Sequence, residues 1–360
     1  MPDLAGGAVS GLRREVERNA TRARNGVKWF AGAEFAPPHP TPSEVVWTNG
    51  KASVRRYTRE TPARYTTPVL AYLGLVSKPY VFDLYKGGSI VEMLMDRGFE
   101  PYVLDWGVPT ALDARNTLET YLEGYLPAAL EAVCDASGAE SVNSFAYCMG
   151  GMMTVQALAA QPDLPINSLV TLAAPFDWSD MGSQVTALQS GKIALKDLLD
   201  ETGNLPASVI VESFKTRKPT SDLVNYANLW QNLWSDQYVE GYQAIGRFLR
   251  DHIPVAGGVA EQIVEQWMRD NAFATDRLRL SGRDLSLADV RTPVLGVIAE
   301  RDDIAPLASA GAISDILPNA KVDKLQIDAG HVSLFAGRQA VKVVMPQVFD
   351  WIAAHCEETP

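Results

Sequence analysis

From about residue 66 onward, short apolar runs alternate with longer amphipathic stretches, and this alternation is the strongest constraint on the fold. The buried-strand patterns "TPVLAYLGLV", "SVNSFAYC" and "INSLVTLAAP" are separated by helical patterns such as "LETYLEGYLPAALEAV" and "MMTVQALAAQ". Strands that alternate with helices form parallel sheets that are covered on both faces. We therefore expect an α/β fold with a mostly parallel central sheet and helices on both sides of it.

The alternation breaks over residues 178–288, where the sequence is mostly helical in pattern, and it resumes with "TPVLGVIAERDD" and "KVDKLQIDAGH". A helical insertion between two late strands of one sheet predicts a cap or lid over the ends of the strands. We expect residues 61–177 and 289–360 to form the core, with residues 178–288 as the helical cap.

Residues 1–60 precede the core and contain three different patterns. Apolar residues three or four positions apart between residues 8 and 30 predict an amphipathic helix. The stretch "FAPPHPTPSE" predicts an extended linker, and "EVVWTNGKASVRRY" predicts a hairpin that turns at Asn49-Gly50. The helix is a candidate docking element for another chain, and packing onto the protein's own core is the alternative.

Composition excludes several classes of function. The 360 residues carry a formal net charge of −11, which argues against a nucleic-acid-binding surface. The chain has three cysteines and neither a Cys-x-x-Cys nor a His-Glu-x-x-His motif, which argues against a disulfide framework and a metal site. Neither a signal peptide nor an apolar run of about 18 residues is evident. We therefore expect a cytoplasmic protein with free thiols and no transmembrane span.

Cys148 occupies the most informative position in the sequence. The strand pattern "NSFAYC" ends at this cysteine, and a glycine-containing turn leads directly into a helix. This is the layout of a nucleophile elbow, in which G-x-S-x-G is the usual pattern and Ala146 and Gly150 supply the small residues here. A cysteine at a helix N-terminus gains thiolate stabilisation from the helix dipole. Cys148 is therefore predicted to be a nucleophile, and a small buried hydrophobic residue is the alternative.

The expected partners of such a nucleophile follow later strands in the order acid, then histidine. Asp302 and Asp303 follow "VLGVIAER", and His331 follows "LQIDAG". We expect His331 to take the proton of Cys148 and Asp302 to fix the imidazole tautomer, with Asp303 as the alternative acid. The other histidines belong to the linker, the end of a cap helix and the terminal helix: His39, His252 and His355.

Two backbone N–H groups are candidates for an oxyanion hole. One is the amide of Met149, which directly follows the nucleophile, and the other lies in the loop after the first core strand, near Leu75 and Val76. We take Val76 as the second donor.

Taken together, these motifs resemble those of the polyhydroxyalkanoate synthases, which have the α/β-hydrolase fold. The length and layout are most similar to the short catalytic subunit of the two-component class III enzymes. "FAYCMGG" resembles the family's cysteine-containing lipase-like box, and "ERDDIAP" and "AGHVSLFAG" resemble its acid and histidine segments. Three positions depart from the family pattern, namely Ala146 in place of Gly, Asp303 in place of His, and Ser333 in place of Gly.

The resemblance implies an acyltransferase in which the Cys148 thiolate takes the acyl group from 3-hydroxyacyl-CoA. Transfer of that group to a hydroxyl of a growing polyester then releases CoA. The resemblance assigns Cys148, Asp302 and His331 to the catalytic triad and implies no bound cofactor. The polyester granule surface, a homodimer and a second, non-catalytic subunit are the expected partners. The alternatives are a cysteine-dependent acyl-CoA thioesterase or small-molecule acyltransferase on the same fold, and a non-catalytic binding protein.

Overall fold

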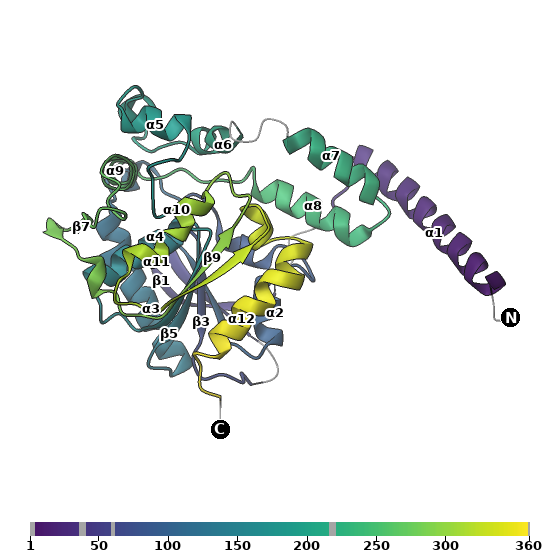
Figure 1. Cartoon of the computed structure of the whole chain (residues 1–360), viewed down its shortest axis with the longest axis horizontal. Helices are drawn as coiled ribbons and strands as arrows, with labels where there is room; N and C mark the ends of the chain where they lie inside the picture. The colour runs from purple at the N-terminus through teal and green to yellow at the C-terminus, as the bar shows by residue number, and fades with distance from the viewer. Residues whose placement is uncertain (1–3, 36–40, 59–61, 216–220, 359–360) are drawn as a thin grey trace.

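A computed structural model describes residues 4–35, 41–58, 62–215 and 221–358. Residues 36–40 of the proline-rich linker, which include His39, lie outside the described residues. An eight-stranded sheet with the order β1-β2-β4-β3-β5-β6-β9-β10 runs through the centre of the body (Figure 1). Its strands are β1 (Ser43–Asn49), β2 (Ala52–Tyr57), β3 (Val69–Tyr72), β4 (Pro101–Asp105), β5 (Val142–Tyr147), β6 (Ile166–Leu172), β9 (Val294–Ala299) and β10 (Val322–Ile327).

The sheet is parallel from β4 to β10, and an antiparallel hairpin extends one edge. β1 and β2 pair with Asn49 opposite Ala52, which confirms the predicted hairpin at Asn49-Gly50, and β2 then pairs antiparallel with β4. Every residue of β3, β5 and β9 is buried. Central strands that are covered on both faces need such continuous apolar runs, and these are what the sequence supplies.

Helices cover both faces of the sheet, as predicted. One hydrophobic core includes side chains of α3 (Leu126–Ser137) and α4 (Met149–Ala160). The core on the other face includes side chains of α2 (Ile90–Asp96) and α12 (Met345–Ala353). Two short helices, α10 (Leu307–Gly311) and α11 (Ile313–Ile316), lie between β9 and β10 in the chain. Short π-helical stretches precede α3 and α12 at Thr120–Tyr125 and Ala340–Val344.

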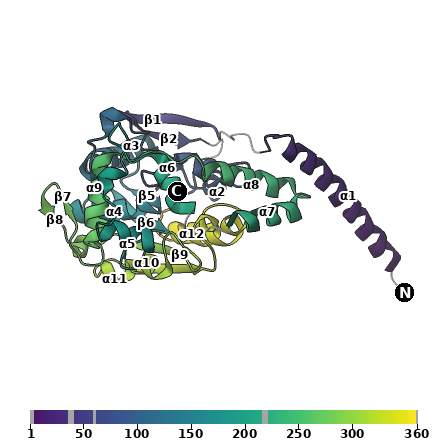
Figure 2. The same ribbon diagram turned by 90° about the horizontal axis from the view of Figure 1, so that it is seen from above.

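The chain leaves the sheet after β6 and returns at β9, and these two strands pair directly, with Leu169 opposite Val294. The excursion between them is mainly helical and lies over one end of the sheet (Figure 2, seen from above). Its helices are α5 (Ser183–Gln189), α6 (Ala207–Lys215), α7 (Ser221–Asn232), α8 (Asp236–Phe248) and α9 (Gly257–Gln262), and a π-helical stretch follows at Ile263–Arg269. The boundaries at residues 178 and 288 stay predictions.

Two details of this excursion differ from the expectation of a purely helical insertion. The stretch "KIALKDLLDE" forms only one turn of 3-10 helix, at Leu195–Asp197. Near its end the chain forms a small hairpin of β7 (Arg279–Leu280) and β8 (Arg283–Asp284). Trp267 is fully buried and donates from Nε1 to Oε1 of Gln156 on α4 at 2.9 Å, so it belongs to the core beneath the cap.

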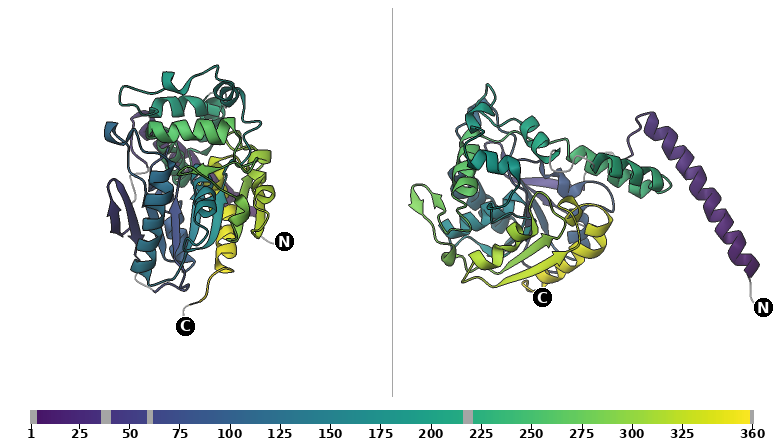
Figure 3. Two further views of the ribbon diagram at one scale, coloured as in Figure 1. Left: turned by 90° about the vertical axis from the view of Figure 1, so that its left-hand side faces the viewer. Right: turned by 45° about the horizontal axis from the view of Figure 1, so that its top comes forward.

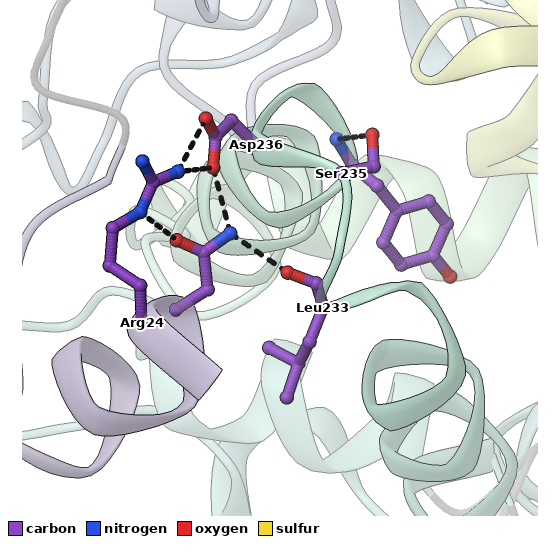
Figure 4. Close-up of polar contacts among 6 residues, drawn as sticks. Arg24, Leu233, Ser235 and Asp236 are labelled. Carbon is purple, nitrogen blue, oxygen red and sulfur yellow. Dashed lines mark hydrogen bonds and ion pairs between the residues drawn. The ribbon is translucent and has the colours of Figure 1, made fainter. Parts of the chain in front are cut away.

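The N-terminal helix α1 (Leu4–Phe30) extends away from the body (Figures 1 and 2, and Figure 3, right). Its C-terminal part contacts the connection between α7 and α8 (Figure 4). Arg24 donates to both carboxylate oxygens of Asp236 at 2.8 Å, and Nδ2 of the buried Asn25 donates to the Leu233 carbonyl at 2.8 Å. Phe30 is 79% exposed, so α1 does not bury its apolar side chains on the protein's own core along its whole length.

Candidate active site

Cys148 lies at a sharp turn between β5 and α4, as predicted. β5 ends at Tyr147 and α4 begins at Met149, so the cysteine is the single residue between a strand and a helix. Its backbone has φ 52° and ψ −123°, a conformation that costs a non-glycine residue about 1–3 kcal/mol. The Cys148 N–H donates to the Leu172 carbonyl at 2.7 Å, which ties the turn to the end of β6.

Glycines allow the start of α4 to approach the neighbouring strands. A Cβ on Gly150 would lie 2.9 Å from the carbonyl carbon of Leu73, and one on Gly151 would lie 2.9 Å from Cβ of Ala174. A Cβ on Gly74 would overlap the side chain of Met149. The loop after β3 therefore begins directly against the first residue of α4. Sequence analysis did not single out Gly74, although its place just after a buried strand was the signal.

Asp302 lies in the loop that follows β9, and His331 lies in the loop that follows β10. Nδ1 of His331 lies 2.7 Å from Oδ2 of Asp302. The other carboxylate oxygen, Oδ1, accepts the backbone N–H groups of Ile304 at 2.7 Å and Ala305 at 2.8 Å. The side chain of Asp302 is 0% exposed and that of His331 is 9% exposed. The turn that carries Asp302 thus orients its carboxylate toward the imidazole and screens it from solvent.

The surroundings of His331 favour its protonated form. Burial alone would lower the pKa of this imidazole. The negative charge of Asp302, the proximity of Cys148 and the hydrogen bonds to both side chains outweigh burial and raise the pKa of His331 to about 10. A positive charge on His331 therefore lies beside the Cys148 sulfur at neutral pH.

The remaining candidate side chains lie elsewhere. Asp303 is exposed, in contrast to its buried neighbour Asp302. His355 lies beyond α12, where its Nδ1 is 2.8 Å from the Trp351 carbonyl. His252 lies after α8 and contacts the loop that follows β3. The structure therefore brings Cys148, Asp302 and His331 together, and it leaves the other described histidines outside this group.

Tyr147 is a neighbour of the site that sequence analysis did not assign. Its ring centroid lies 5.1 Å from that of His331 and 4.4 Å from that of Phe335. The ring is buried, and burial together with the negative charges of Cys148 and Asp302 raises the pKa of Tyr147 well above its usual value. The Tyr147 side chain is therefore uncharged, and its packing restricts the position of the His331 imidazole ring.

The two candidate oxyanion donors lie at the start of α4 and in the loop after β3. The N–H of Met149 is at the N-terminus of α4, where the first amides of a helix have no partner within the helix. Val76 lies in the loop that starts against Met149. Within the described part of the chain, neither the Met149 N–H nor the Val76 N–H donates a hydrogen bond. Both donors are thus available to a ligand.

The described part of the chain contains no group of three or more His, Cys, Asp or Glu side chains that could hold a metal ion. Every helix in it is too short or too polar to cross a membrane.

Several curated proteins are similar to this chain over most of its length. The poly(3-hydroxyalkanoate) polymerase subunit PhaC of Haloferax mediterranei is 30% identical over 326 residues, which are 89% of this chain and 66% of the relative. The subunit of the same name from Thiocystis violacea is 26% identical over 346 residues, or 95% of this chain and 96% of the relative. The chain thus spans about two thirds of the haloarchaeal protein and nearly all of the bacterial one. These relatives confirm the resemblance to polyhydroxyalkanoate synthases.

Solved structures agree on the fold. A putative lipase from Sulfolobus solfataricus has a TM-score of 0.55 and 14% sequence identity, covering 88% of this chain and 99% of the lipase. A thermophilic esterase from Thermogutta terrifontis has a TM-score of 0.52 and 15% sequence identity. The match covers 88% of this chain and 100% of the esterase. The family model for the alpha/beta hydrolase fold matches residues 82–337. The chain therefore belongs to the alpha/beta-hydrolase fold family.

Proposed function

We propose that this protein is an acyltransferase of the polyhydroxyalkanoate synthase type, with Cys148 as nucleophile, His331 as base and acid, and Asp302 as the group that orients His331. One observation carries the proposal. A cysteine sulfur, and not a serine hydroxyl, occupies the strained turn beside an imidazole whose other nitrogen is bound by a buried carboxylate. The relatives named as poly(3-hydroxyalkanoate) polymerases supply the substrate class, a 3-hydroxyacyl-CoA.

In the first half of the reaction, His331 holds at Nε2 the proton that it shares with Cys148, and the Cys148 thiolate attacks the thioester carbonyl carbon. The negative charge that develops on the carbonyl oxygen is accepted by the N–H groups of Met149 and Val76. The carbon–sulfur bond to CoA then breaks, and His331 returns its proton to the departing CoA sulfur. The products are free CoA and an acyl group bound to Cys148.

In the second half, the hydroxyl of another 3-hydroxyacyl unit loses its proton to His331 and attacks the acyl carbon. An ester forms and the Cys148 thiolate is released beside the imidazolium. His331, and not Asp302, is assigned as the base for this hydroxyl. The side chain of Asp302 is 0% exposed, and both of its oxygens already accept hydrogen bonds. The substrate hydroxyl therefore cannot reach the Asp302 carboxylate.

The same proposal covers the partners. No bound cofactor is needed, because the acyl group and the leaving group both come from the substrate. The proposed enzyme is cytoplasmic and works at a polyester granule. It forms a homodimer and binds a second, non-catalytic subunit. The projecting α1, with its exposed Phe30, is the candidate docking element. Sedimentation velocity of the full chain, alone and with a candidate subunit, tests the assembly.

The test of the activity uses the purified full chain with 3-hydroxybutyryl-CoA. Free CoA thiol is followed over time and the acyl product is analysed, with Cys148→Ala as the control. Release of CoA with an ester oligomer as product, lost in Cys148→Ala, is the expected result. Release of CoA with only free 3-hydroxybutyrate would make the protein a cysteine-dependent thioesterase. Release that persists in Cys148→Ala would refute Cys148 as nucleophile.

A further inference from the structure

Three consecutive residues of the cap, 251–253, follow α8 and contact the catalytic region. They lie along residues 76–78 of the loop after β3, where Ser77 and His252 form an isolated antiparallel bridge. The N–H of Ile253 donates to the Val76 carbonyl at 3.0 Å. At the other end, Nζ of Lys78 lies 2.7 Å from Oδ1 of Asp251. The cap is thus joined to the very loop that carries the candidate oxyanion donor.

The His252 side chain adds a second donor to the same carbonyl. Its Nδ1 lies 3.0 Å from the Val76 carbonyl oxygen and 3.1 Å from Oγ of Ser77. Because a carbonyl oxygen can only accept, Nδ1 carries the proton. Burial lowers the pKa of His252, against the opposing effects of the Val76 carbonyl and Asp251, so the ring is neutral and Nε2 carries no proton.

The opposite side of the ring is enclosed. Phe214 lies 5.2 Å and Phe248 lies 6.0 Å from the His252 ring, measured between centroids. Nε2 is buried and has no hydrogen-bond partner among the residues that the structure describes. The aromatic side chains therefore hold the ring in place, and Nδ1 is the ring nitrogen that makes hydrogen bonds.

We propose that His252 is a positioning residue for the acylation step, which holds the Val76 loop so that the Val76 N–H faces the oxygen of the acyl group. Two donors on one carbonyl fix the orientation of the Val76–Ser77 peptide. Gly74 fixes the other end of the loop against Met149. The Val76 N–H belongs to the neighbouring Leu75–Val76 peptide, which lies between these two contacts, so its orientation depends in part on a side chain that the cap supplies. The inference rests on the proposed role of Val76 as an oxyanion donor.

The experiment compares two reactions of Cys148 in the full chain. Acylation by 3-hydroxybutyryl-CoA, followed as CoA release in a single turnover, develops an oxyanion. Alkylation by iodoacetamide displaces iodide directly at a carbon atom and develops none. Because Cys134 and Cys356 are also free, it is followed at Cys148 alone by peptide mass spectrometry, where it reports on the Cys148–His331 pair. The variants are His252→Ala, which removes the donor, and His252→Asn, whose amide nitrogen can take the place of Nδ1. His355→Ala is the matched control outside the site.

We expect His252→Ala to slow acylation about 10- to 100-fold, since complete removal of an oxyanion donor typically costs about 100- to 1,000-fold. Alkylation should stay within about twofold of the wild type in the same variant. His252→Asn should restore most of the acylation rate, and His355→Ala should change neither reaction.

Three results would overturn the proposal. Unchanged acylation in His252→Ala would show that the ring does not position the loop. An equal fall in acylation and alkylation would show general disruption of the site. Acylation as slow in His252→Asn as in His252→Ala would show that the Nδ1 bond is not the cause. CoA release that persists in Cys148→Ala is a separate result and would refute the proposed function itself.

Discussion

Replacement of Asp302 by Asn tests the proposed triad most directly, because Asn has nearly the same shape. Its carbonyl oxygen can keep the two hydrogen bonds that Oδ1 accepts from Ile304 and Ala305. The reversed orientation would set an NH2 group against two N–H donors and lose both bonds. The Asn amide nitrogen therefore faces Nδ1 of His331, where Asp302 Oδ2 now accepts at 2.7 Å.

That arrangement forces His331 into the wrong tautomer. An amide nitrogen only donates, so Nδ1 must accept and the proton moves to Nε2, the atom that has to take the Cys148 proton. The charge that chiefly raises the pKa of His331 is also lost, while the burial that lowers the pKa remains. We expect CoA release to fall about 1,000- to 10,000-fold, or ~4–5.5 kcal/mol in transition-state stabilisation.

The assay is CoA release from 3-hydroxybutyryl-CoA near neutral pH, with a thermal unfolding curve to show that the variant is folded. Asp303→Asn is the matched control, because this exposed neighbour belongs to the same turn, and it should stay within a few-fold of the wild type. Asp302→Asn activity above about a tenth of the wild-type rate would refute the tautomer argument. A larger loss in Asp303→Asn would move the acid to Asp303.

Three further predictions concern stability. Cys148→Gly should unfold at higher urea than Cys148→Ala, by about 0.5–2 kcal/mol, because glycine relieves the φ of 52°; equal stabilities would show that the turn is unstrained. The folded chain holds the His331 proton more tightly than the unfolded chain, whose histidine pKa is near 6.5. This contribution is complete below about pH 6.5 and is lost as pH rises through about 10, so urea titrations should show wild type losing stability relative to His331→Gln over that window; a constant difference would contradict it. Limited proteolysis within α1 should accelerate more in Asn25→Ala, which loses a buried hydrogen bond, than in Arg24→Ala, which loses an exposed ion pair; the reverse order would contradict it.

The core of the fold and the position of Cys148 could be predicted because their signals are local. A buried strand, a residue at a tight turn and a helix follow one another within about twenty residues around Cys148. The hairpin at Asn49-Gly50 has an equally local signature. Helical pattern was less reliable within the insertion, where Leu195–Asp197 forms only a single turn. No residue from 191 to 200 is buried, so tertiary packing does not support a longer helix there.

The choice between Asp302 and Asp303 could not be made from the sequence, since adjacent carboxylates in one turn have the same local pattern. The structure distinguishes them by burial and by the backbone N–H groups of Ile304 and Ala305, which donate to Asp302. The contact of His252 with Val76 was beyond sequence reasoning for another reason. It joins positions 176 residues apart, and no periodicity links them.

The direct pairing of β6 with β9 has a consequence for biosynthesis. A ribosome delivers the strands in chain order, so β6 emerges with an open edge that stays unpaired until the whole helical insertion has been made. The elbow with Cys148 can form during this interval, whereas Asp302 and His331 arrive only with the last two strands. A nascent chain therefore carries Cys148 on a formed turn without its histidine. Cys148 pairs with His331 only when the final strands join the sheet.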